Sequence, residues 1–184
     1  MFTEPVAAAC EILEQIDLSP TDRVLVVGDG KMGLLVVQVL AKTGAMVSLL
    51  GKHPENFRRI KDHRIVRIPA QRYKPRPVFD IAVEVSGSPT GWDIARRSLR
   101  PRGTLVLKST YAGAFDFNPA PLVIDEITVM GSRCGPFVPA MALLAAEDVQ
   151  TAGLIDGTYT LERAAKAFTH AKRRGVLKIL FEVE

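Results

Sequence analysis

Residues 23–41 of the chain read RVLVVGDGKMGLLVVQVLA. The run from Arg23 to Val27 is short and almost wholly apolar, which is typical of a strand buried on both faces of a parallel sheet. The residues from Met32 to Ala41 are apolar almost all round, which predicts a buried helix. A strand, a glycine-rich turn and a helix are therefore expected to follow one another directly.

The turn between this strand and helix has glycines at positions 28, 30 and 33, the spacing G-x-G-x-x-G. In that pattern Gly28 permits a tight turn, Gly30 lets a diphosphate approach the backbone, and Gly33 lets the helix pack closely on the strand. Free N–H groups and the helix dipole attract the diphosphate. Glycine can serve a turn for structural reasons alone, but the strand and helix on either side favour a dinucleotide site.

Strands and helices alternate along the rest of the chain. We expect further strands over residues 46–50, 65–68, 80–85, 104–108, 127–130 and 176–183. We expect further helices over residues 4–16, 54–61, 90–99, 139–149 and 161–174, with a turn at 100–103. This alternation predicts an α/β fold, a Rossmann-type doubly wound parallel sheet in three αβα layers.

Length and composition are those of one globular domain. The chain has 184 residues, of which 47% are hydrophobic and 24% charged, so residues 1–184 are expected to form a single domain with a leading helix in residues 1–22. No apolar run reaches the ~18 residues that cross a bilayer, and no export signal is visible, so no membrane partner is expected. Cys10 and Cys134 form neither a disulfide framework nor a zinc pair, which favours the cytoplasm.

The net charge of +4 is concentrated in one segment. Residues 52–76 hold nine Lys or Arg and two Asp or Glu, a net charge of +7, so the other residues together carry −3. A local positive charge favours a local anion. One alternative is therefore a non-catalytic nucleotide- or partner-binding module, in which this segment touches nucleic acid or an acidic partner. No helix-turn-helix, RNA-binding sheet or zinc-finger pattern accompanies it, so no nucleic-acid partner is expected.

The end of the second strand bears on the choice of dinucleotide. NAD-binding sites of this type carry an acidic residue there, which accepts hydrogen bonds from the adenosine ribose. The corresponding residues here are Gly51, Lys52 and His53, and none is acidic. Lys52 and His53, with Arg58 nearby, can donate charge-assisted hydrogen bonds to a ribose 2′-phosphate. The sequence therefore favours NADP(H) over NAD(H), although these can also be ordinary solvated loop residues.

A methyltransferase that uses adenosylmethionine is another alternative, because its sheet and glycine turn look similar. That class needs a carboxylate after the second strand to hold the ribose, and residues 51–53 supply none. Adenosylmethionine also lacks the diphosphate that a helix N-terminus of this kind suits. The dinucleotide is therefore the better match.

Two further strand ends are expected at the same crevice, because ligands lie outside the carboxyl ends of parallel strands. They are Ser86-Gly87 and Lys108-Ser109-Thr110. Small residues there permit close approach of a cofactor, and hydroxyl groups can bond to its riboses. Ser86 and Ser109 can also simply cap the elements that follow them.

Several short motifs occur in an order and spacing that resemble those of a known family. They are Glu4-Pro5, GDGKMGL at 28–34, VEVSG at 83–87, GTLV at 103–106 and GSRCG at 131–135, with an ending at 159–180 that is similar too. Together they resemble the zinc-dependent alcohol dehydrogenase type of the medium-chain dehydrogenase/reductase family, along essentially the whole chain. The resemblance implies an oxidoreductase that transfers hydride between a nicotinamide and an alcohol or carbonyl substrate.

The resemblance also implies which residues lie along the dinucleotide. Those at the diphosphate and adenosine end would be Gly28, Gly30, Lys31, Met32, Gly33, Gly51, Lys52 and His53. Those near the riboses and nicotinamide would be Ser86, Gly87, Lys108, Ser109, Thr110, Ser132, Arg133 and Cys134, the last of these through its main chain. The strand at 127–130 matches the edge through which family members pair, so a homodimer is expected.

Glu4 matches a glutamate near the family's catalytic zinc, which in polyol dehydrogenase-like members can be a ligand. The family's other zinc ligands, proton relay and most of its substrate pocket belong to an N-terminal domain that has no counterpart here. A catalytic zinc needs about three protein ligands, which the spacing of Glu4, Cys10 and the histidines does not supply. We therefore expect the cofactor half of an oxidoreductase, inactive alone and without catalytic residues of its own, with zinc only in a complete enzyme.

The missing catalytic domain, or a separate subunit that supplies it, is accordingly an expected partner. In the family, residues corresponding to 151–184 return toward that domain. The strand at 176–183 is therefore expected to have lost its partners and to present an unpaired edge.

Overall fold

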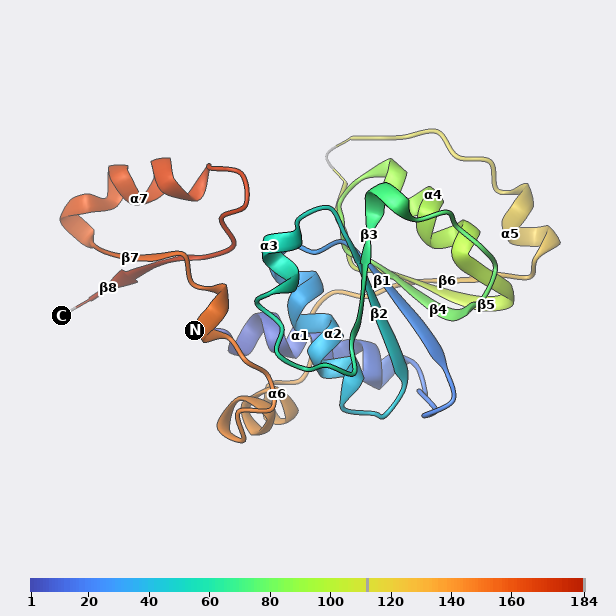
Figure 1. Ribbon diagram of the computed structural model, residues 1–184, viewed down its shortest axis with the longest axis horizontal. Helices are drawn as coiled ribbons and strands as arrows, with labels where there is room; N and C mark the ends of the chain where they lie inside the picture. The colour runs from blue at the N-terminus through green and yellow to red at the C-terminus, as the bar shows by residue number, and fades with distance from the viewer. Residues whose placement is uncertain (112, 184) are drawn as a thin grey trace.

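A computed structural model of the chain describes residues 1–111 and 113–183 (Figure 1). Its main sheet has six parallel strands in the order β3-β2-β1-β4-β5-β6, the strand order of the Rossmann fold. The strands are β1 (Arg23–Val27), β2 (Met46–Gly51), β3 (Val66–Pro69), β4 (Phe79–Glu84), β5 (Leu99–Leu107) and β6 (Thr128–Gly131). The predicted fold class is confirmed.

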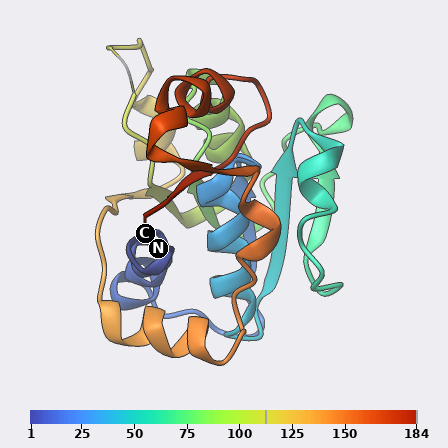
Figure 2. The same cartoon turned by 90° about the vertical axis from the view of Figure 1, so that its left-hand side faces the viewer.

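Helices lie on both faces of this sheet (Figures 1 and 2). The longer ones are α1 (Thr3–Gln15), α2 (Lys31–Ala41), α4 (Pro89–Ser98), α6 (Phe137–Ala145) and α7 (Ala164–Ala171). Short helices occur at α3 (Pro54–Phe57) and α5 (Ala120–Ile124), with 3-10 turns at Ala70–Arg72, Ala152–Leu154 and Leu161–Arg163. Within the described ranges, no helix combines the length and the apolar character that crossing a membrane requires.

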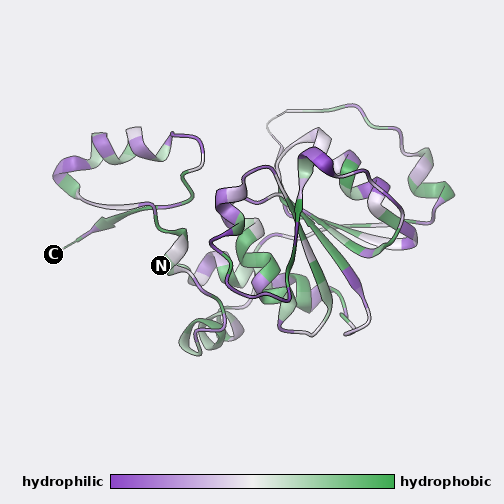
Figure 3. Ribbon diagram, in the orientation of Figure 1, coloured by the Kyte–Doolittle hydropathy of each residue, from purple (hydrophilic) through white to green (hydrophobic). Residues whose placement is uncertain are grey.

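Strand β1 shows how the sheet is covered on both faces. Val24 and Val26 pack into a core shared with α1 and α2, whereas Leu25 and Val27 pack into a second core with α4. The faces alternate because successive side chains of a strand point in opposite directions. Burial on both faces explains why the strand is one continuous apolar run, and Figure 3 shows hydrophobic residues gathered on the central strands and on α2.

The carboxyl ends of the central strands lie along one edge of the sheet. Val27 at the end of β1 pairs with Leu50 of β2 and Glu84 of β4, and Glu84 pairs with Leu107 of β5. The turns that follow these strands therefore open onto the same edge, where ligands of open α/β sheets bind.

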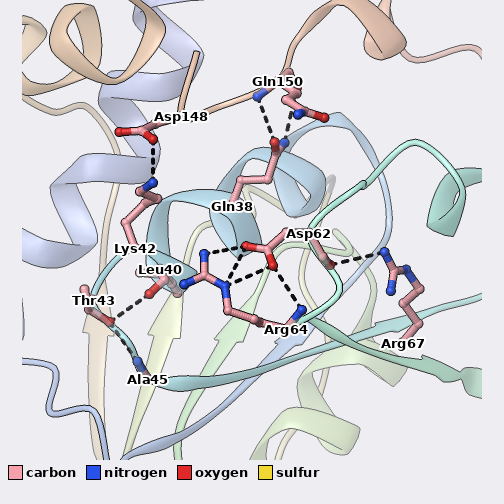
Figure 4. Close-up of polar contacts among 10 residues, drawn as sticks. All are labelled: Gln38, Leu40, Lys42, Thr43, Ala45, Asp62, Arg64, Arg67, Asp148 and Gln150. Atoms are coloured by element: carbon pink, nitrogen blue, oxygen red, sulfur yellow. Dashed lines mark hydrogen bonds and ion pairs between the residues drawn. The ribbon is translucent and has the colours of Figure 1, made fainter. Parts of the chain in front are cut away.

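Polar side chains tie α2 to the segment that follows α6 (Figure 4). The amide of Gln38 on α2 accepts a hydrogen bond from the backbone N–H of Gln150 at 2.8 Å and donates one to the carbonyl of Gln150 at 3.3 Å. Lys42 forms an ion pair with Asp148 beside it. These contacts hold the helix that follows the glycine turn against a distant part of the chain.

The C-terminal residues form a second, two-stranded sheet, seen on the left of Figure 1. Strands β7 (Gly157–Thr160) and β8 (Ile179–Glu182) pair in parallel, and α7 packs on both. Strand β7 was not predicted, and it supplies a partner for the C-terminal strand, so the expectation that this strand had lost its partners is wrong. On its other side no strand lies beside β8 in the described ranges.

Asp156 fastens this C-terminal part to the rest of the protein. Its carboxylate accepts a hydrogen bond from the backbone N–H of Leu177 at 2.6 Å and forms an ion pair with Arg59 at 2.8 Å. Burial alone would raise the pKa of Asp156, but these two partners hold it below its usual value. The segment just before β8 is therefore anchored beside the main sheet.

Several predicted bounds differ from the structure. Helix α6 ends at Ala145 rather than at residue 149, and strand β8 begins at Ile179 rather than at residue 176. Strand β5 begins at Leu99, and the predicted turn at 100–103 is an irregularity within this strand, where Arg102 has a left-handed φ of 64°. The predicted helix at 161–174 is a 3-10 turn followed by the shorter α7. The assignment of residues 1–184 to one domain stays a prediction.

The predicted helix at 54–61 ends early, as α3. The guanidinium of Arg67 donates hydrogen bonds to the carbonyls of Phe57 at 3.1 Å and Ile60 at 2.7 Å. The Arg67 side chain thus satisfies carbonyls that helical hydrogen bonds would otherwise satisfy, so the helix can end at Phe57.

Candidate nucleotide-binding cleft

The glycine turn lies between β1 and α2, at the carboxyl edge of the sheet. Gly28 has a φ of 123°, and a Cβ there would lie 2.8 Å from the backbone nitrogen of Ser86. A Cβ on Gly33 would overlap the carbonyl oxygen of Gly28, so this glycine permits close packing of α2. A Cβ on Gly30 would meet nothing within 4 Å, which leaves this part of the backbone open to a ligand.

A cleft of about 470 Å³ lies at this turn. Six of the predicted cofactor residues line it, namely Gly28, Gly30, Gly51, Lys52, His53 and Ser86. The sequence did not predict several others that line it, among them Asp29, Asn56, Ala70, Thr90, Ile94, Arg174, Gly175, Val176 and Leu177. The segment that Asp156 anchors before β8 thus forms one wall of the cleft.

The other predicted cofactor residues do not line this cleft. They are Lys31, Met32, Gly33, Gly87, Lys108, Ser109, Thr110, Ser132, Arg133 and Cys134. They lie at the start of α2 or just after the ends of β4, β5 and β6. They therefore follow the same carboxyl edge of the sheet, beyond the cleft itself.

Asp29 is the main residue of the cleft that the sequence did not reveal. Its side chain is buried, and its carboxylate accepts a hydrogen bond from the backbone N–H of His53 at 2.6 Å. It also lies 3.0 Å from Nδ1 of the same histidine. A carboxylate is therefore present beside the end of β2, where the local sequence shows none. The only signal in the sequence is an acidic residue inside the glycine motif.

Three of the nine basic side chains in residues 52–76 are bound within the protein. Arg59, Arg64 and Arg67 donate hydrogen bonds to Asp156, Asp62 and the carbonyl of Ile60, at 2.8, 2.7 and 2.7 Å respectively. Figure 4 shows the second of these pairs. Lys52 lines the cleft, is exposed, and makes no side-chain hydrogen bond to the described residues. Its ammonium is therefore available to an anion in the cleft.

Glu84 is a fully buried carboxylate at the end of β4. Its Oε1 accepts hydrogen bonds from the backbone N–H of Ser86 at 2.7 Å and from the Ser86 hydroxyl at 2.5 Å. Its Oε2 accepts one from the hydroxyl of Tyr111 at 2.6 Å. Burial, and then the neighbouring carboxylate, raise the pKa of Tyr111 well above its usual value. This network joins the loop after β5 to the edge of the cleft.

Lys108 joins the ends of β5 and β6. Its ammonium donates hydrogen bonds to the hydroxyl of Ser132 at 3.1 Å and to the carbonyl of Arg133 at 2.8 Å. Burial lowers the pKa of Lys108, although nearby negative charges act in the opposite direction. Beside it, the hydroxyl of Ser109 accepts a hydrogen bond from the backbone N–H of Gly87 at 2.8 Å. The predicted strand ends are thus bonded to one another.

The start of α2 carries a half-buried ammonium. Burial lowers the pKa of Lys31, the positive charge of Lys178 lowers it further, and Glu4 acts in the opposite direction. Lys178 also lies over the ring of Phe2, at 5.0 Å from its centroid. Lys31 therefore carries a positive charge at a helix N-terminus that has no side-chain cap, an arrangement that suits an anion.

No protein-family model matches the chain. Over 97% of its length it is 26% identical to sorbitol dehydrogenase of Halalkalibacterium halodurans and 28% identical to D-arabinitol dehydrogenase 1 of Uromyces fabae. The chain is a homologue of these polyol dehydrogenases. The resemblance to zinc-dependent medium-chain dehydrogenases is thereby confirmed. The chain spans 57% and 56% of the lengths of the two relatives.

Solved dehydrogenase structures share the fold of this chain. L-idonate 5-dehydrogenase from Escherichia coli matches 97% of this chain over 55% of its own, with a TM-score of 0.87 and 23% identity. A putative zinc-binding dehydrogenase from Sinorhizobium meliloti, solved with NADP bound, matches 99% of this chain over 58% of its own, with a TM-score of 0.86 and 21% identity. These similarities show the fold.

The described part of this chain forms no group of three His, Cys, Asp or Glu side chains close enough to hold a metal ion. Glu4 is exposed near the start of α1, Cys10 is buried in the same helix and Cys134 is exposed after β6. A zinc ion bound through Glu4 would therefore need ligands from outside the described residues.

Proposed function

We propose that this chain binds NADP(H) and forms the cofactor-binding part of an oxidoreductase that transfers hydride between the nicotinamide and an alcohol or carbonyl substrate. The observation that carries the proposal is the open backbone of Gly30 at the cleft, where a Cβ would meet nothing within 4 Å. The similarity to polyol dehydrogenases supports it. The bound cofactor supplies the hydride chemistry, while this chain binds and orients it.

The start of α2 is the proposed site for the diphosphate. The first N–H groups of a helix have no carbonyl partner in a preceding turn, so they are available to phosphate oxygens. Lys31 adds positive charge at the same place, and a bound anion would offset its repulsion from Lys178. The chain thereby fixes the middle of the dinucleotide.

The proposed preference for NADP(H) rests on residues 51–53. Gly51 ends β2 without a side chain, and Lys52 and His53 line the cleft directly after it. Charge-assisted hydrogen bonds from these two side chains suit a 2′-phosphate. Structures that share the fold have been solved with either cofactor, Staphylococcus aureus TarJ with NADPH and an Escherichia coli dehydrogenase with NADH, so the residues and not the fold support this preference.

The nicotinamide end is proposed to follow the ends of β4, β5 and β6. Gly87 has a φ of 67° and an open Cβ position, and the hydroxyl of Ser109 lies against its N–H. Backbone groups at Ser132 to Cys134 come next along the same edge. This order places small residues and backbone groups where a flat ring and its ribose can approach.

Zinc, the substrate and the other partners are proposed from the relatives. Zinc in a complete enzyme would polarise the substrate oxygen, with Glu4 near it and the remaining ligands supplied by a further domain or subunit. We propose a homodimer through β6, whose Val129 is exposed, as are Val123 and Ile124 of α5. The two free cysteines, far apart in the sequence, favour a cytoplasmic location.

Titration of the purified protein with NADPH and, separately, NADH tests the cofactor proposal. We expect tighter binding of NADPH and a loss of about tenfold in Lys52→Ala, which corresponds to one charge-assisted contact. Lys61→Ala is the matched control, because Lys61 is exposed in the same basic segment and does not line the cleft. Equal binding of the two cofactors would contradict the preference, and binding of neither would contradict the proposal.

A further inference from the structure

A buried carboxylate occupies the space beside the end of β2. Asp29 stands between the first two glycines of the turn and is only 5% exposed. A Cβ on Gly51 would overlap the Asp29 side chain and lie 2.5 Å from its Oδ2. The missing side chain at the end of β2 therefore makes room for a carboxylate that comes from the glycine turn.

Three contacts connect Asp29 to the loop after β2. Its Oδ2 accepts a hydrogen bond from the backbone N–H of His53 at 2.6 Å, and its Oδ1 lies 3.0 Å from Nδ1 of the His53 ring. The amide of Asn56 donates a hydrogen bond to the Asp29 carbonyl at 2.8 Å. Asp29 thus fixes both the backbone and the ring of His53 against the glycine turn.

The arrangement determines which atoms are available to a ligand. Both carboxylate oxygens of Asp29 are engaged by His53, and the side chain has little exposure, so ribose hydroxyls would reach it only after those bonds were broken. The second ring nitrogen of His53, Nε2, has no partner among the described residues, and the ring lines the cleft. With Nδ1–H donating to Asp29, Nε2 is the nitrogen that meets a ligand, and it donates to a phosphate oxygen when the ring carries both protons.

Asn56 supplies an independent sign that a ligand belongs here. It is 2% exposed and lines the cleft, and its Oδ1 is a buried side-chain acceptor that lacks a partner in the described part of the chain. Leaving such an acceptor unpaired is costly, and a hydroxyl or amino group of a bound nucleoside would satisfy it.

We propose that Asp29 is a positioning residue for the adenosine end of the cofactor, which holds His53 so that its Nε2, together with Lys52, binds the ribose 2′-phosphate. This inference rests on the proposed function and deepens it. NAD-specific sites carry a carboxylate at this strand end that binds the ribose hydroxyls. Asp29 lies beside the same strand end but does not bind the ribose. Its negative charge is directed to His53 and away from the phosphate.

The test measures dissociation constants of NADPH and NADH, and of 2′,5′-ADP and 5′-AMP as probes that differ only in the 2′-phosphate. Asp29→Asn keeps the size of the side chain and removes its charge. We expect it to weaken binding of NADPH and 2′,5′-ADP by about tenfold and to change NADH and 5′-AMP by less than about twofold. Asp62→Asn is the matched control, since Asp62 is a carboxylate that pairs with Arg64 outside the cleft.

The double variant Asp29→Asn with His53→Phe tests whether Asp29 acts through the histidine. We expect it to bind NADPH no more weakly than His53→Phe alone, because the two residues act as one unit. His53→Phe also serves if Asp29→Asn fails to fold, since it keeps a ring of similar shape and leaves Asp29 in place. It too should lose affinity selectively for the ligands with a 2′-phosphate.

An unchanged or tighter NADPH affinity in Asp29→Asn, or an equal loss for all four ligands, would overturn this inference and leave dinucleotide binding intact. Retention of the full NADPH preference in His53→Phe would overturn it as well. Binding of neither dinucleotide to the unaltered protein would overturn the proposed function and this inference with it.

Discussion

The hydroxyl of Tyr111 donates a hydrogen bond of 2.6 Å to Oε2 of Glu84, a carboxylate with no exposure to solvent. Tyr111 belongs to the loop after β5, and Glu84 ends β4 beside the cleft. The bond therefore ties a loop near the proposed nicotinamide end to the edge of the sheet.

Tyr111→Phe should lower the free energy of unfolding by about 1–3 kcal/mol, because it leaves one oxygen of a buried carboxylate without its donor. Chemical denaturation followed by circular dichroism measures this. Tyr159→Phe is the control, since the hydroxyl of Tyr159 on β7 bonds to His170 on α7 rather than to a buried charge. A loss no larger than that of the control would show that Tyr111 does not hold Glu84.

Stability should also depend on the ionisation of Tyr111. Burial and Glu84 raise its pKa in the folded protein, so the folded state keeps a proton that the unfolded state releases near pH 10. The stabilisation is fully present below about pH 10 and decreases as the pH rises further. Unfolding measured between about pH 9 and 11 should show this decrease, and Tyr111→Phe should reduce it. Identical pH profiles for the two proteins would refute the assignment.

Gly30 and Gly33 of the turn should respond differently to replacement by alanine. Gly33→Ala is expected to destabilise the fold by more than about 2 kcal/mol, because its Cβ would overlap the backbone of Gly28. Gly30→Ala should fold like the unaltered protein, since its Cβ has open space and its φ is −74°. It should nevertheless weaken NADPH binding by at least about tenfold by obstructing the diphosphate. Full NADPH affinity in a folded Gly30→Ala protein would argue against this turn as the binding site.

Lys31→Met should raise the stability of the protein while it weakens binding of the cofactor. Burial and the charge of Lys178 disfavour the Lys31 ammonium, so its removal is expected to raise the melting temperature. The same change removes a positive charge from the proposed diphosphate site and should weaken both NADPH and NADH. A lower melting temperature with unchanged affinity would contradict both expectations.

The proposed dimer depends on one edge of the sheet. Val129 on β6 is 39% exposed, and a lysine there would place a charge on the proposed interface. Val129→Lys should therefore shift a dimer toward monomer in sedimentation experiments. Val66→Lys is the control, because Val66 is 56% exposed on β3 at the opposite edge. An unaltered protein that remains monomeric at all concentrations would refute the dimer.

The fold could be predicted from the sequence where burial is extreme. Strand β1 has the predicted bounds, since both of its faces are covered and every residue from Val24 to Val27 is apolar. Strand β7 was not predicted, because it is only four residues long, is half-exposed and has the sequence Gly-Thr-Tyr-Thr. Strand β5 was predicted to start late because Pro101 and Arg102 resemble a turn, although pairing with β4 begins at Leu99.

The site could be predicted only where its residues are close in sequence. The glycine spacing located the turn, and the end of β2 supplied Lys52 and His53. The carboxylate of Asp29 could not be assigned, because its role depends on a contact with His53 that is created when β1 and β2 pair. The wall formed near Arg174 was missed for the same reason, since only tertiary packing through Asp156 brings it to the cleft.

A nitrogen-15 nuclear magnetic resonance titration of the unaltered protein with NADPH tests most directly whether the cleft binds the dinucleotide. We predict saturable shifts of the backbone amides of residues 28–34 and 51–56, with smaller changes elsewhere. Binding that shifts neither segment, or no binding at millimolar NADPH, would contradict the claim that this cleft holds the dinucleotide.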